Sequence, residues 1–125
     1  MKRNLATRSL HTRNRLAQPR QLSDPNELKS IVRDGLVSMN MAEREDFIQT
    51  LETEMRRASL NMRAYLVPLG IPGRSPEDLT PTEVGHLIRF LKINVPAATA
   101  AVEKAMSRYS VFAEKAQQTT DRLAA

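Results

Sequence analysis

The stretch NMAEREDFIQTLETEMRRASLNMRAYL, residues 40–66, decides the expected fold. Its apolar residues recur at steps of three and four, which is the heptad pattern of a helix that packs along one edge. This first seam consists of Ile48, Leu51, Met55, Ala58, Met62 and Tyr65. Asn40 and Glu43 have the spacing of a capping box, in which each side chain bonds the backbone N–H of the other. We therefore predict a helix over residues 40–66, roughly 40 Å long at about 1.5 Å per residue.

A second long helix is predicted over residues 95–117. Its apolar residues also step by three and four, and additional alanines and a methionine widen the stripe, as is typical of a helix inside a bundle. This second seam includes Val102, Tyr109 and Phe112. Because a bare apolar seam is unstable in water, we expect the two long helices to pair, within one chain or between two copies.

Two shorter helices are predicted over residues 25–39 and 81–92. Each begins with a capping residue, a proline at the first helical position and a glutamate two residues later, which together are a strong helix start. Between the second and third helices, residues 67–80 contain three prolines and two glycines, which exclude an interior helix there. The expected fold is therefore all-α, a small helical bundle of about four helices.

The N-terminal 23 residues differ from the rest of the chain in charge. They contain no acidic residue and six basic ones: Lys2, Arg3, Arg8, Arg13, Arg15 and Arg20. The remaining residues contain 13 basic and 14 acidic side chains, so the body of the protein is nearly neutral. The leucines of this segment are spaced too widely for a helical stripe. We predict a disordered or extended basic arm at 1–23, a helical domain at 24–118 and a C-terminal tail at 119–125.

Four roles of the basic arm remain open. Its arginines fit binding to RNA or DNA phosphates, which would release counterions. The arm also fits an acidic protein surface on which it would order only when bound. It is rich in Arg and free of acids, as mitochondrial presequences are. The fourth role is that of a solvated tail that only increases solubility. We expect a cytoplasmic protein, or one of the mitochondrial matrix if the arm is a presequence.

Composition excludes several classes of site. The chain has no cysteine, so it has no disulfide and no zinc–thiolate centre. No apolar run approaches the roughly 18 residues that cross a bilayer, so we expect no transmembrane segment. His11 lies in the arm and His86 stands alone on a short helix, while the acidic residues cluster at helix starts, where capping explains them. We therefore expect no catalytic residue, no metal and no cofactor.

The segment Arg56-Arg57-Ala58-Ser59-Leu60 resembles the substrate sequence of a basophilic protein kinase, with two arginines before the serine and an apolar residue after it. Kinases bind such sequences in an extended conformation. The predicted helix 40–66 would hide this one, so the sequence alone favours a chance match.

The function expected from the sequence is that of a non-catalytic helical interaction protein, such as an assembly factor, an adaptor or an accessory subunit of a larger complex. Arg56, Arg57 and Arg63 lie on the predicted long helix away from its seam, where they form either a second contact surface or an ordinary solvated face. The alternative is a nucleic-acid-associated protein that binds RNA or DNA phosphates through the arm. Expected partners are thus another protein, a second copy, or nucleic acid.

Overall fold

The computed structural model describes residues 24–71 and 75–124, with side chains up to Arg122. Within these residues the regular structure is entirely helical, which confirms the predicted all-α class. The basic arm lies outside the described residues. The α-helices are α2 (Pro25–Val37), α3 (Met41–Arg57), α4 (Pro81–Asn94), α5 (Thr99–Ser107) and α6 (Ser110–Ala124). Short 3-10 turns connect them: η2 (Met62–Tyr65), η3 (Val67–Leu69), η4 (Pro76–Asp78) and η5 (Pro96–Ala98).

The helices begin where the capping signals predict. Asp24 accepts hydrogen bonds from the first amides of α2, at 3.0 Å from the Asn26 nitrogen. Complete capping boxes start α3 at Asn40 and α4 at Thr80. These side chains satisfy backbone amides that have no partner inside the helix.

The predicted long helix 40–66 is wrong at its C-terminal end, because α3 ends at Arg57. Ser59 takes a left-handed conformation with φ 63°. The Leu60 amide then donates to the Met55 carbonyl at 2.8 Å, and the Ser59 amide donates to the Arg56 carbonyl at 2.9 Å. This pair of bonds is the Schellman closure of a helix, and it leaves Ala58 exposed instead of in a packing seam.

The predicted helix 95–117 is also interrupted. α5 ends at Ser107 and α6 begins at Ser110, so the chain changes direction at Arg108 and Tyr109. The physical reason is packing on two different partners, because α5 lies against α3 while α6 lies against α2. The two long uninterrupted helices with matched seams are therefore not present. α6 continues through Ala124, beyond the predicted domain limit at residue 118.

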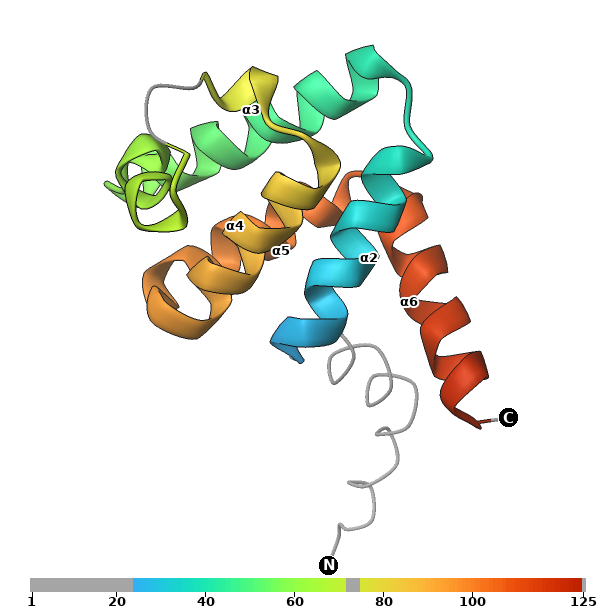
Figure 1. The fold of residues 1–125 in the computed structure, drawn as a ribbon. Helices are drawn as coiled ribbons and strands as arrows, with labels where there is room; N and C mark the ends of the chain where they lie inside the picture. The colour runs from blue at the N-terminus through green and yellow to red at the C-terminus, as the bar shows by residue number, and fades with distance from the viewer. Residues whose placement is uncertain (1–23, 72–74, 125) are drawn as a thin grey trace, which may run out of the picture.

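Helix α2 occupies the middle of the fold, with α4 on one side and α6 on the other (Figure 1). Two glycines allow this close approach. A Cβ on Gly85 of α4 would lie 2.7 Å from the Lys29 carbonyl oxygen of α2. A Cβ on Gly35 of α2 would lie 2.7 Å from the ring of Phe112 in α6. Both contacts are shorter than packed side chains tolerate, so these positions suit only glycine.

A single apolar cluster joins all five α-helices. Phe47 of α3 and Phe112 of α6 lie at its centre, with ring centroids 4.9 Å apart. Of the seam residues named above, six are buried: Ile48, Leu51, Met55, Met62, Val102 and Phe112. Tyr65 and Tyr109 are half-buried at the edge of the cluster. The apolar spacing thus marks buried residues even where the helix that it predicts is broken.

Candidate functional site

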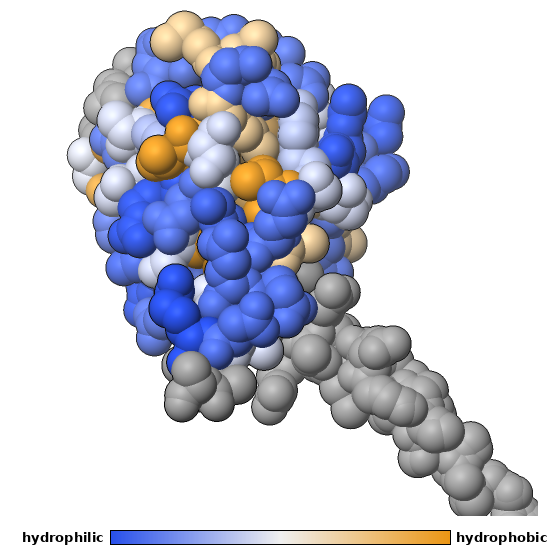
Figure 2. Space-filling view, turned by 90° about the vertical axis from the view of Figure 1, so that its right-hand side faces the viewer, coloured by the Kyte–Doolittle hydropathy of each residue, from blue (hydrophilic) through white to orange (hydrophobic). Residues whose placement is uncertain are grey.

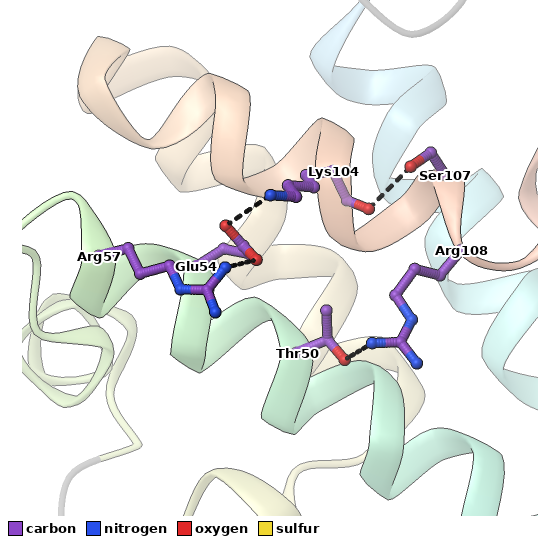
Figure 3. Close-up of polar contacts among 6 residues, drawn as sticks. All are labelled: Thr50, Glu54, Arg57, Lys104, Ser107 and Arg108. Atoms are coloured by element: carbon purple, nitrogen blue, oxygen red, sulfur yellow. Dashed lines mark hydrogen bonds and ion pairs between the residues drawn. The ribbon is translucent and has the colours of Figure 1, made fainter.

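A polar groove runs between α3 and α5, and we call it the α3–α5 groove. It is an open hollow of about 360 Å³. Its lining residues are Asp46, Gln49, Thr50, Thr53, Glu54, Arg57, Lys104 and Arg108. The side chains from the two helices point toward one another across it (Figure 3).

Helical spacing explains how these residues come together. Asp46, Thr50 and Glu54 are four residues apart, so they lie on one side of α3. Lys104 in α5 and Arg108 directly after it are also four residues apart and face them. The groove therefore forms from two polar stripes on helices that are far apart in sequence.

Glu54 is the acidic centre of one end of the groove. Its Oε2 accepts a hydrogen bond from Nη1 of Arg57 at 3.0 Å, and its Oε1 lies 3.6 Å from Nζ of Lys104. The Glu54 side chain is only 14% exposed, whereas those of Arg57 and Lys104 are 66% and 63% exposed. The carboxylate thus lies beneath the two cations, and the cations form the outer surface.

Asp46 is the acidic residue at the other end of the groove, where it pairs with Arg108. Nη2 of Arg108 lies 3.6 Å from its Oδ2, and Nη1 of Arg108 donates to Oγ1 of Thr50 at 3.3 Å. The hydroxyl of Tyr109 also donates a hydrogen bond to Asp46. Removal from water, together with the hydrogen bond to Asp46 and its negative charge, raises the pKa of Tyr109 to about 12.

The groove is suited to binding an anionic group. Three cations from α3, α5 and the residue after α5 surround two carboxylates, and hydroxyl and amide side chains lie between them. Guanidinium and ammonium groups form strong, charge-assisted hydrogen bonds with carboxylate and phosphate oxygens. At the Glu54 end, where both cations are far more exposed than the carboxylate, a ligand approaching from solvent meets positive charge first. At the other end Asp46 is 46% exposed beside Arg108, which is 56% exposed.

The predicted contact surface of Arg56, Arg57 and Arg63 is divided in the structure. Arg57 lies in the α3–α5 groove. Arg56 lines a separate hollow of about 280 Å³, together with Ser59 and Leu60. Arg63 is exposed on η2 and lines neither hollow. The arm residues Lys2, Arg3, Arg8, Arg13, Arg15 and Arg20 lie outside the described residues.

Lys104 and Arg108 were not predicted from the sequence as residues that line one groove with Arg57. A signal was present, because two polar stripes with a spacing of four residues occur on α3 and on α5. Pairing these stripes requires the knowledge that α5 packs on α3. Apolar periodicity alone gives the buried face of each helix, and it does not identify the helix on the other side.

Apolar side chains are exposed at the corner between α2 and α3. Val37 at the end of α2 is 60% exposed, and Met41 at the start of α3 is 70% exposed. On the face shown in Figure 2, the apolar side chains lie mainly in the upper half, among hydrophilic ones, while the lower half is mostly hydrophilic. This corner is a second surface feature besides the groove.

A three-residue metal site and a membrane-spanning helix are both absent from the described residues. Side chains of His, Asp and Glu within 24–71 and 75–122 do not form a group of three that could hold a metal ion. Each helix in the described part of the chain is too short or too polar to cross a membrane.

Comparisons of the chain with protein-family models, with curated proteins and with solved structures found no match.

Proposed function

We propose that the protein is a non-catalytic helical interaction protein, acting as an assembly factor, an adaptor or an accessory subunit of a larger complex. Its α3–α5 groove is the proposed contact surface, and the partner contributes an acidic segment. The observation that carries this proposal is the arrangement of Arg57 and Lys104, both more than 60% exposed, above a Glu54 carboxylate that is 14% exposed.

Stability alone does not account for these charges. Both cations are more than 60% exposed, so solvent screens their attraction to Glu54 and each pair contributes on the order of 1 kcal/mol to folding. Complementary charges across an interface, by contrast, accelerate association and select the partner. The exposed cations of the groove are therefore better suited to recognising an acidic partner than to holding α3 against α5.

Capture experiments with two matched double variants test this function. The full-length protein is purified with a tag from its own cells after nuclease treatment, and the accompanying proteins are identified. Lys104→Ala with Arg108→Ala removes two cations of the groove, and Arg33→Ala with Arg122→Ala removes two exposed cations elsewhere.

A defined set of proteins should accompany the wild type and the Arg33/Arg122 control but not the groove variant. Retention of the same proteins by the groove variant would contradict the proposed surface. A second copy of the chain is the other candidate partner. Sedimentation of the purified protein distinguishes it, because self-association gives a dimer without any other protein.

Charge asymmetry favours one alternative function, which is binding of RNA or DNA phosphates through the proposed basic arm. Six basic and no acidic residues lie within 1–23, whereas the rest of the chain is nearly neutral. Each phosphate contact should contribute to a salt-dependent affinity. Deletion of 1–23 should abolish salt-sensitive nucleic-acid binding under this alternative, and it should leave protein capture intact under the first proposal.

A further inference from the structure

Ser59 lies immediately beyond the end of α3, in the turn that closes the helix. It is exposed, and among the described residues other than glycine it alone has a positive φ. The helix therefore does not enclose Ser59, contrary to the expectation for a continuous helix over residues 40–66.

The residues around Ser59 have the pattern that basophilic serine kinases recognise. Arg56 and Arg57 stand three and two positions before the serine, and Leu60 follows it. Both arginines are exposed on the last turn of α3. Arg56 and Ser59 also line the same surface hollow, so the acceptor hydroxyl and one recognition arginine are presented on one face.

We propose that Ser59 is a phosphorylation site for a basophilic serine/threonine kinase. In this reaction Oγ of Ser59 attacks the γ-phosphorus of ATP held by the kinase. A new O–P bond forms, the bond between the γ-phosphorus and the bridging β–γ oxygen breaks, and ADP leaves. The hydroxyl proton passes to the catalytic carboxylate of the kinase.

Access requires a local opening rather than unfolding of the domain. A kinase binds its substrate extended, so the two Schellman bonds that close α3 at Met55 and Arg56 must open. Helix ends open more readily than helix interiors. Serine is also strained in the left-handed conformation, and opening relieves that strain. Leu60, which is half-buried against the core, is the apolar contact that must be released.

The arginines near Ser59 could bind the phosphate group after phosphorylation. A phosphoserine adds a charge of about −2 at neutral pH, and arginines are its preferred partners. Arg56 lies in the same hollow and Arg57 is two residues away. Glu52 also lies in this hollow and repels the phosphate. Because Arg56 is the cation that lines the hollow, we expect Arg56 to bind the phosphate.

The test uses the full-length folded protein with ATP and the catalytic subunit of a cyclic-AMP-dependent kinase, followed by mass spectrometric site mapping. We expect a phosphate on Ser59. Ser59→Gly removes the acceptor hydroxyl and suits the left-handed φ, so it should lose that phosphate while remaining folded. Ser110→Ala is the matched control, because it removes another exposed serine and should leave the labelling unchanged.

Recognition is tested with two arginine variants. Arg56→Ala should lower the rate at least about tenfold, because it removes a charge-assisted contact with the kinase. Arg63→Ala removes an exposed arginine outside the motif and should not change the rate.

Three results would overturn the proposal. One is site mapping of the labelled wild type that finds phosphate on other residues and none on Ser59. Another is that the kinase labels neither the folded chain nor a synthetic peptide of residues 52–64. The third is labelling of the peptide without labelling of the folded chain, which would show that the closed turn protects Ser59.

Discussion

Ser59 holds a left-handed backbone conformation that favours glycine, and the Schellman turn after α3 depends on it. We expect Ser59→Gly to raise the free energy of unfolding by about 0.5–1 kcal/mol, because relief of strain exceeds the added entropy of the unfolded chain. The urea midpoint at constant m-value measures this change. Ser59→Ala keeps the strain and should change stability little. Equal stabilisation by alanine would show that strain is not the cause.

Tyr109 should ionise near pH 12 in the folded protein, above its ordinary value of 10. The folded state favours the neutral phenol, so the raised pKa contributes to the free energy of unfolding. This contribution is fully present below pH 10 and is lost as the pH rises from 10 to 12. Phenolate absorbance in a Tyr65→Phe background, which leaves one tyrosine, measures the titration.

Asp46→Asn is the control variant for the titration of Tyr109. It removes the negative charge and the carboxylate acceptor, so the pKa of Tyr109 should fall toward 10. It should remain above 10, because burial is the largest cause of the increase. An unchanged titration would show that Asp46 does not contact the phenol in solution.

Helix starts could be predicted from the sequence, because their signals are local. Asn40 with Glu43, and Thr80 with Glu83, form the capping boxes that their spacing indicates. Helix ends could not be predicted in the same way. No glycine marks the end of α3, and Met62 remains buried on a 3-10 turn that continues the apolar spacing.

The break between α5 and α6 has no local signal at all. Neither glycine nor proline occurs near Tyr109, and the apolar periodicity continues across it. Tertiary contacts determine the break. Tyr109 bonds to Asp46 of α3, while Phe112 packs on Phe47 and against Gly35 of α2. The α3–α5 groove depends on the same arrangement, which is why the shared contact of Arg57 and Lys104 with Glu54 was not predicted.

The contact of α2 with α4 should be sensitive to a single methyl group at Gly85. Gly85→Ala places a Cβ 2.7 Å from the backbone oxygen of Lys29, which has little room to move. Overpacking of this kind costs about 1–3 kcal/mol, and the better helix propensity of alanine offsets about 1 kcal/mol. We therefore expect a net loss of up to about 2 kcal/mol in the free energy of unfolding measured with denaturant.

His86→Ala, at the exposed position next to Gly85, is the control for this contact. Its effect should stay within about 0.5 kcal/mol. Stabilisation by Gly85→Ala would show that α2 and α4 pack less closely than 2.7 Å implies.

At the scale of the whole molecule, the all-α class followed from the sequence, but the arrangement of the helices did not. Among the described residues, the apolar cluster joins side chains between Leu28 and Ala116, all of them in the helical part of the chain. Deletion of residues 1–23 should therefore leave the helical circular dichroism and the thermal midpoint unchanged. Loss of cooperative unfolding in the truncated chain would show that the core extends into the deleted segment.

The central position of α2 has a consequence for synthesis of the chain on the ribosome. α2 is among the first helices to emerge, yet the two helices that cover it, α4 and α6, begin only at Pro81 and Ser110. Translation proceeds at about 5–20 residues per second, so the apolar face of α2 stays uncovered for several seconds. Leu28, Ile31 and Val32 are then accessible to a chaperone that binds nascent chains. The fold can be completed only after the last helix has left the exit tunnel.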